Sequence, residues 1–126
     1  HVGDLVLQDV ARRLQAALRR IDHICRIGGE EFGLILPHTG EAEAAEVATR
    51  LLARPFGIDL AAPGGGRVDV TMSYGGVTTG DGCGEASELY RKADAMLYLS
   101  KERGRNRCHV WRDDAEPVLL TPPRTA

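Results

Sequence analysis

The residues best suited to chemistry in this sequence are two adjacent acids, the last pair of Gly28-Gly29-Glu30-Glu31. Two carboxylates this close together repel each other, and a bound divalent cation would relieve that repulsion. Mg²⁺ takes oxygen ligands and commonly combines one or two carboxylates with substrate phosphates. The two glycines would let a nucleotide approach the backbone closely. The segment therefore suits a metal–triphosphate site, although the same four residues also make a good solvated hairpin turn.

The flanking pattern predicts the elements that position these acids. Apolar, β-forming residues at 24–27 and 32–36 lie on either side of the glycines, which indicates a β-hairpin with the acids at its tip. Residues 3–20 carry apolar side chains three and four positions apart, which is typical of an amphipathic helix. The same criteria predict helices at about 41–52 and 85–102 and strands at about 68–77 and 107–111. This order favours an α+β fold, with helices packed on a mostly antiparallel central sheet.

Length and composition narrow the class of protein. The chain has 126 residues, which is the usual size of one domain, and its 43% hydrophobic and 27% charged residues are typical of a soluble globular protein. A formal charge of −2 argues against a protein that coats nucleic acid. No apolar stretch is long enough to span a bilayer, so we expect no membrane segment.

Both ends of the sequence suggest a piece of a longer protein. It begins without an initiator Met and without the basic and apolar regions of a signal peptide. Its three cysteines form neither a CxxC pair nor a zinc pattern, which fits a reducing cytoplasm. Pro117, Pro122 and Pro123 make the end proline-rich. We therefore expect a domain over residues 1–112 and a disordered tail or linker over 113–126.

Several motifs in this sequence occur together in one known family. The segment Arg26-x-Gly28-Gly29-Glu30-Glu31-Phe32, followed by Leu36-Pro37, resembles the signature of GGDEF-family diguanylate cyclases in its GGEEF form. Further matches stand in family order along the chain: Gly3-Asp4 with Leu7, Thr71-x-Ser73-x-Gly75, Ala93-Asp94-x-x-Leu97-Tyr98 and Lys101-x-x-Gly104-Arg105-Asn106. The resemblance implies a palm-type nucleotidyl-cyclase fold with a ferredoxin-like core. It also implies condensation of two GTP into cyclic di-GMP with release of two pyrophosphates.

The resemblance assigns roles at the acidic tip. Glu31 matches the residue that binds the catalytic metal, Mg²⁺ or Mn²⁺, and Glu30 matches one implicated in metal binding or in activating the attacking 3′-hydroxyl. Gly28 and Gly29 match the glycines that lie against the substrate. These roles agree with the chemistry, because a reaction at an α-phosphate needs divalent ions to activate the attacking oxygen and stabilise the leaving one.

Four more residues match substrate contacts of the family. Asp4 matches the acceptor of the guanine N1–H and 2-amino groups, and Leu7 matches part of the base pocket. Lys101 and Arg105 match residues that contact the GTP phosphates. Each polar residue also has a simpler interpretation, because an acid at a helix N-terminus and cations near a C-terminus stabilise the helix dipole without any ligand.

A second site is suggested by Arg19-x-x-Asp22, which is separated from Gly28 by five residues. It resembles the family's inhibitory product site, and Arg50 matches that site's additional arginine. The planar fork of arginine can bind a phosphate, or the O6/N7 edge of guanine, through two hydrogen bonds. The alternative is a weak surface salt bridge at i,i+3 spacing.

The resemblance also sets expectations beyond these residues. The family's first strand, with a metal-binding Asp and a guanine-reading Asn, should precede residue 1, and His1 is one position out of register with the family's histidine. Catalysis would require a homodimer in the bacterial cytoplasm, regulated by an attached sensory domain, with no nucleic-acid partner. Two alternatives remain: an inactive GGDEF domain that senses cyclic di-GMP or GTP, and a purely structural dimerisation domain.

Overall fold

A computed structural model describes residues 2–59, 64–79 and 84–124 of the chain. His1, Cys83 and part of the glycine-rich loop predicted at 62–66 lie outside the described residues. The chain divides into two compact units, the first made of His1–His38 with Pro55–Val70 and the second of Thr39–Arg54 with Thr71–Ala126. None of the described helices combines the length and the apolar character needed to cross a bilayer.

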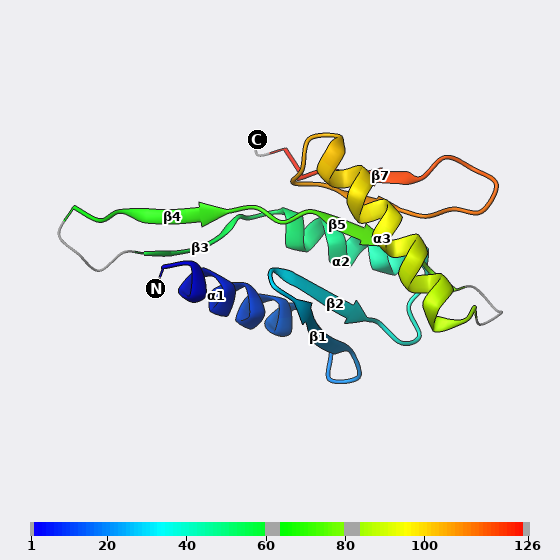
Figure 1. Cartoon of the computed structure of the whole chain (residues 1–126), viewed down its shortest axis with the longest axis horizontal. Coiled ribbons are helices and arrows are strands. Elements are labelled where there is room, and N and C mark those ends of the chain that lie inside the picture. Colours follow the sequence, from blue (N-terminus) through cyan, green and yellow to red (C-terminus); the bar gives the residue numbers. More distant parts are fainter. Residues whose placement is uncertain (1, 60–63, 80–83, 125–126) are drawn as a thin grey trace. The chain divides into compact units, whose positions relative to one another are not determined.

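The first unit contains the predicted N-terminal helix and the acidic hairpin. Helix α1 spans Val2–Ala17, and strands β1 (His23–Gly28) and β2 (Glu31–Ile35) pair antiparallel, which confirms both predictions (Figure 1). A second antiparallel pair, β3 (Phe56–Asp59) with β4 (Arg67–Val70), completes the unit. Strand β3 was not predicted, because four residues with a glycine carry little β signal.

The buried side of α1 is a stripe of apolar residues one turn apart. Val6, Val10 and Leu14 are 7%, 1% and 1% exposed, as their i,i+4 spacing predicts. Phe56 at the start of β3 is also 1% exposed, and the Arg13 guanidinium lies 4.3 Å from the centroid of its ring. A cation over an aromatic face is attracted by the ring quadrupole. Helix α1 therefore packs against β3.

The second unit is built on a small mixed sheet. Helix α2 spans Glu41–Leu52 and helix α3 spans Ala86–Glu102, close to the predicted bounds. Strands β5 (Tyr74–Gly76), β6 (Cys108–Val110) and β7 (Val118–Leu120) follow the order β5-β6-β7, with β5 parallel and β7 antiparallel to β6. The core joins Leu52 of α2 to Cys108 and Val110 of β6.

Two predictions differ from the structure in this part of the chain. The single strand predicted at 68–77 is two strands, because β4 pairs with β3 in the first unit and β5 pairs with β6 in the second. The prediction of disorder over 113–126 is wrong at Val118–Leu120, which forms β7. Val118 and Leu120 pack against the Leu52–Cys108–Val110 cluster, so a short apolar run outweighs the surrounding prolines. The domain boundary at residue 112 stays a prediction.

Gly75 allows α3 to lie directly on β5. A Cβ added at this position would be 2.2 Å from the Ala93 carbonyl oxygen and 2.2 Å from the Leu97 amide nitrogen, both main-chain atoms of α3. Backbone cannot move aside as a flexible side chain can, so only glycine fits at this crossing. At neighbouring Gly76 an added Cβ would meet only the Val110 Cγ2, at an ordinary 3.6 Å.

We therefore expect Gly75→Ala to lower the free energy of unfolding by roughly 1–3 kcal/mol or more, the usual cost of overpacking. Gly76→Ala is the matched control and should change stability little. Urea unfolding followed by circular dichroism measures both. Equal stability of the two variants would show that α3 does not contact β5 as described.

A buried polar group joins α3 to the sheet. Ser100 is 0% and His109 5% exposed. The Ser100 hydroxyl donates to the Tyr74 carbonyl oxygen at 2.7 Å, and its oxygen lies 2.9 Å from His109 Nδ1. Since the hydroxyl proton is used on Tyr74, the His109 Nδ1–H must donate to Ser100. Burial, followed by the charges of Arg103 and Arg107, lowers the pKa of His109, so the neutral ring is favoured.

This pKa shift predicts that stability falls in mild acid. With the native pKa of His109 below the ordinary value of about 6.5, the unfolded chain binds more protons as the pH drops through that value. The unfolding free energy should therefore be constant above about pH 7 and decrease below about 6.5. His109→Asn, which retains a donor at the Nδ1 position but does not titrate, should flatten the decrease. An unchanged slope in thermal unfolding between pH 7.5 and 5 would contradict the prediction.

Candidate functional site

The acidic tip lies on an irregular hairpin turn. The register of β1 and β2 pairs Arg26 with Phe32 and Gly28 with Glu31, with a bulge between Arg26 and Gly28. Gly29 has a φ of 50°, in the left-handed region that glycine adopts at little cost. No atom beyond its chain neighbours lies within 4 Å of a Cβ added there, so backbone conformation rather than crowding requires the glycine. The turn is open to an approaching ligand.

Arg26 closes the turn from within the hairpin. Its Nε and Nη2 atoms donate to the Gly29 carbonyl oxygen at 2.9 and 2.6 Å. Hydrogen bonds from a charged donor are shorter and stronger than neutral ones, so this contact holds the turn in one conformation. Arg26 belongs to the family-like motif, but no role for it was predicted from the sequence. Its position three residues before a left-handed glycine is the signal that could have suggested one.

Glu30 and Glu31 are both exposed, and neither carboxylate has a hydrogen bond or ion pair with a described residue. Among the described residues no group of three or more His, Cys, Asp or Glu side chains could hold a metal ion. The pair supplies what Mg²⁺ typically takes from a protein when phosphates complete its shell, namely one or two carboxylates. The residues present therefore fit a divalent cation that is shared with a nucleotide.

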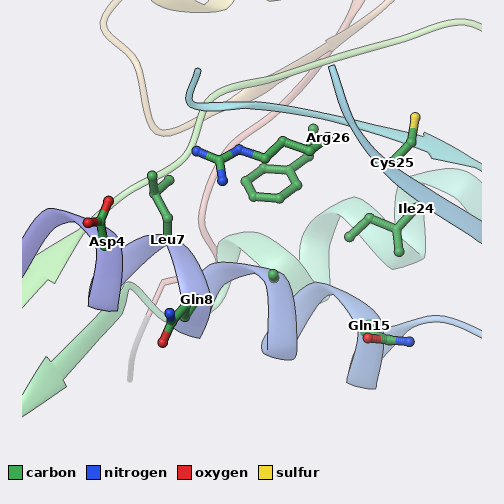
Figure 2. A pocket seen from close by; sticks show the side chains of 9 residues that line it. Asp4, Leu7, Gln8, Gln15, Ile24, Cys25 and Arg26 are labelled. Atoms are coloured by element: carbon green, nitrogen blue, oxygen red, sulfur yellow. The ribbon is translucent and has the colours of Figure 1, made fainter. Parts of the chain in front are cut away.

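A groove of about 480 Å³ lies beside this turn, between α1 and the hairpin. Asp4 and Leu7 of α1 line it with Arg26 and Phe32 of the hairpin. Figure 2 shows Leu7, Ile24 and Arg26 between the two elements, whereas the Gln8 amide and the Cys25 thiol point away from this space. Its volume falls in the range of small-molecule sites, about 300–1,000 Å³. The structure thus brings Asp4 and Leu7, the two residues predicted to bind the base, to a groove that is also lined by the hairpin whose end carries Glu30 and Glu31.

Other residues of the groove were missed by the sequence analysis. They are Gln8, Ala11, Gln15, Ile24 and Cys25. The members from α1 follow Asp4 and Leu7 at spacings of three and four, so they share one helical face. That spacing could have identified them. However, Val6, Val10 and Leu14 form a more strongly apolar stripe on the same helix, and this stripe gives the main periodic signal. Gln8 and Gln15 are the two amide residues among those that were missed.

The predicted inhibitory pair borders a second, smaller hollow of about 230 Å³. Asp22 accepts hydrogen bonds from the Arg19 main-chain nitrogen at 2.7 Å and from Arg19 Nη2 at 2.8 Å, and its side chain is 3% exposed. The side-chain hydrogen bond to Arg19 is the main cause of a lowered Asp22 pKa. Arg19 Nη2 also donates to the Pro37 carbonyl oxygen at 2.7 Å. The pair is therefore a preformed turn as well as a predicted ligand site.

The remaining predicted residues belong to the second unit. Lys101 is in the last turn of α3, Arg105 follows the helix with a φ of 63°, and Arg50 is in α2. All three side chains are exposed. The approach of Lys101 and Arg105 to the acidic turn, and of Arg50 to Arg19, stays a prediction.

Comparison with known proteins identifies the family. Residues 1–107 match the family model described as diguanylate cyclase, GGDEF domain. The response regulator PleD of Caulobacter vibrioides is 40% identical over 107 residues, covering 83% of this chain and 23% of PleD. The GGDEF domain of PA1120 (TpbB or YfiN) from Pseudomonas aeruginosa has a TM-score of 0.78 at 28% identity, covering 88% of this chain and 64% of that one. The active GGEEF domain of a diguanylate cyclase from Vibrio cholerae has a TM-score of 0.66 at 27% identity, covering 89% and 70%.

These matches confirm the α+β nucleotidyl-cyclase-like fold expected from the sequence. The chain spans less than a third of the length of its curated relatives, 30% of one from Bacillus subtilis and 23% of PleD. The family model covers the acidic turn, the groove, the Arg19–Asp22 pair and both predicted phosphate-binding cations. The chain therefore belongs to the GGDEF family of diguanylate cyclase domains.

Proposed function

We propose that this domain is an active diguanylate cyclase, which joins two GTP molecules into cyclic di-GMP. The observation that carries the proposal is the pair of carboxylates, Glu30 and Glu31, which form no ion pair with a described residue and lie on a turn closed by Arg26. Adjacent like charges cost free energy in any fold, so their retention beside a nucleotide-sized groove favours a cation-dependent function.

The base and the phosphates would be held by different parts of the chain. In the groove, Asp4 can accept hydrogen bonds from the guanine N1–H and 2-amino group, while Leu7 packs on the base. Lys101 and Arg105 would offset the negative charge of the triphosphate. No described atom beyond the chain neighbours lies within 4 Å of a Cβ added at Gly28 or Gly29, so phosphate oxygens could approach the main chain there.

The reaction forms a bond between a 3′-oxygen and an α-phosphorus and breaks the bond from that phosphorus to pyrophosphate. A bound Mg²⁺ or Mn²⁺ would lower the pKa of the attacking hydroxyl and neutralise charge on the leaving group. Glu31 would hold that ion, and Glu30 would share it or accept the hydroxyl proton. One domain holds one GTP, so two copies must face each other for each 3′-hydroxyl to reach the other nucleotide. Activity therefore requires a homodimer.

Regulation would come from two sources. This chain covers only 30% and 23% of the length of two curated relatives. This favours a longer bacterial protein in which a sensory domain controls dimerisation. The Arg19–Asp22 hollow, with Arg50, would bind the product cyclic di-GMP and inhibit the enzyme. A GTP-consuming domain of this kind would act in the cytoplasm. An inactive domain that only senses cyclic di-GMP or GTP is the alternative, and the intact acidic pair argues against it.

Glu31→Gln tests the metal role, because it removes one negative charge at nearly constant volume. In a longer protein that contains this chain, we expect cyclic di-GMP formation from GTP and Mg²⁺ to fall at least about 100-fold, the scale of losing one preorganised electrostatic contact. Glu46→Gln, an exposed acid of α2, is the matched control and should leave the rate unchanged. Turnover retained in Glu31→Gln, measured by chromatography of the product, would exclude the assigned role. A wild-type protein that binds GTP without product would instead support the sensing module.

Arg19→Ala tests the inhibitory assignment. Loss of the guanidinium should weaken binding of cyclic di-GMP at least about tenfold and relieve product inhibition, while the first turnovers keep their rate. Arg12→Ala is a suitable control, since Arg12 also forms an i,i+3 pair, with Asp9 at 3.3 Å, on the same unit. Calorimetry with cyclic di-GMP measures the affinity. Equal affinity in both variants would discard the product site.

A further inference from the structure

The segment that leaves α3 has an unusual backbone. Gly104, Arg105 and Asn106 have φ values of 130°, 63° and 50°, so three successive residues have positive φ, which L-amino acids rarely adopt. Only glycine adopts such values freely, and asparagine more readily than arginine. A conformation of this kind persists where surrounding contacts determine it. Arg105, one of the two predicted phosphate-binding cations, is therefore presented from a strained turn.

Hydrogen bonds around Ser100 and at the start of β5 hold this turn. The Ser100 carbonyl oxygen accepts the Arg105 N–H at 2.8 Å, which caps the helix. The next residues are tied to β5, since the Asn106 N–H donates to Ser73 Oγ at 3.2 Å and the Arg107 carbonyl oxygen accepts the Tyr74 N–H at 2.8 Å. The turn is thus fastened at its beginning to α3 and at its end to β5.

The Ser100 side chain links α3 to strands β5 and β6. Its hydroxyl donates to the Tyr74 carbonyl oxygen at 2.7 Å and accepts from His109 Nδ1 at 2.9 Å. One hydroxyl therefore connects three elements. The end of α3 and strand β6 lie before and after the turn, and β5 is the strand paired with β6. Both side chains are almost wholly buried, at 0% and 5% exposure, so water does not compete for these bonds.

We propose that Ser100 and His109 are positioning residues, which hold Lys101 and Arg105 in the arrangement that receives the GTP triphosphate. The inference rests on the proposed function, because it takes the two cations as phosphate ligands. Lys101 is next to Ser100 in the chain, and Arg105 is bonded to its carbonyl group. A cation on a long side chain binds phosphate better when its main chain is fixed, since less conformational freedom is lost on binding.

Substitutions at His109 separate positioning from simple packing. Asparagine places its amide nitrogen where the imidazole has Nδ1, whereas glutamine places it where the imidazole has Nε2. His109→Asn therefore retains a donor toward Ser100, and His109→Gln does not, although both are neutral, polar amides. Ser100→Ala removes the shared hydroxyl but leaves the main-chain bond to Arg105. Thr49→Val is the matched control, since it removes a comparable hydroxyl, which donates to Ala45 in α2 at 2.8 Å.

The test measures binding of a non-hydrolysable GTP analogue with Mg²⁺ by calorimetry, in a longer protein that contains this chain and with the melting temperature of each variant recorded. Ser100→Ala and His109→Gln should weaken binding about fivefold to tenfold, the effect of about one hydrogen bond. His109→Asn and Thr49→Val should bind within about twofold of the unaltered protein. This pattern supports the proposal when the melting temperatures show that every variant is folded at the temperature of the binding measurement.

Other outcomes overturn it. Ser100→Ala and His109→Gln that melt earlier but bind the analogue normally would show that the pair only stabilises the core, and the cyclase proposal would stand. Unchanged binding in Arg105→Ala would show that the turn presents no phosphate ligand, and the positioning role would fail with it. Whether the protein makes cyclic di-GMP is decided separately by the product assay, so the two failures can be told apart.

Discussion

The structure of the site depends on keeping two carboxylates together at the end of a short hairpin. Their mutual repulsion works against any compact turn, and neither carboxylate forms an ion pair with a described residue. The turn is instead held by groups that do not touch the carboxylates. Arg26 binds the Gly29 carbonyl oxygen with two hydrogen bonds, and Gly29 accepts a left-handed conformation. The acids thus stay available to an external cation, while the charge of Arg26 is used on the backbone.

The groove beside the hairpin depends on a second set of contacts, which fix α1. Asp9 accepts the Gly57 N–H at 3.1 Å, and Arg13 stacks on Phe56. Gly57 itself leaves no space for a side chain, because an added Cβ would be 2.0 Å from the Val68 carbonyl oxygen. These contacts lie on the side of α1 that faces β3. Asp4 and Leu7 can therefore remain at the groove, since the attachment of the helix uses other residues.

Elements with strong periodicity could be predicted from the sequence, and elements defined by partners could not. Helix α2 has the predicted bounds because its alanines and leucines repeat at helical spacing between Pro37 and Pro55. Strands β3 and β7 are three or four residues long, and their existence depends on β4 and β6, which no local pattern reveals. The same holds for the break between β4 and β5, where a continuous β-forming sequence serves two different sheets.

In the candidate site, too, residues marked by a local motif could be predicted, and residues that act through tertiary contacts could not. The acidic pair and Asp4 could be found because motif spacing marks them, and the structure brings Asp4 to the groove beside the hairpin. The supporting residues were missed, since Arg26 and Ser100 bind main-chain carbonyl groups and His109 binds the Ser100 hydroxyl, contacts that a sequence does not display. Ser100 even lies on the inward face of α3, where the pattern predicted apolar side chains.

The acidic hairpin and the end of α3 share one feature, which is a rigid backbone that carries exposed charged side chains. A charged side chain meant for a ligand must not be neutralised by its own protein, yet the backbone beneath it must be rigid. At the hairpin a neighbouring arginine holds a carbonyl group, and at α3 a buried serine and histidine hold the stems of a left-handed turn. In each case these bonds do not use the charged groups proposed to meet the ligand, which form no ion pair with a described residue. The positive φ of Arg105 and the repulsion between Glu30 and Glu31 are thus two local costs, and in each unit neighbouring hydrogen bonds hold the backbone that carries them.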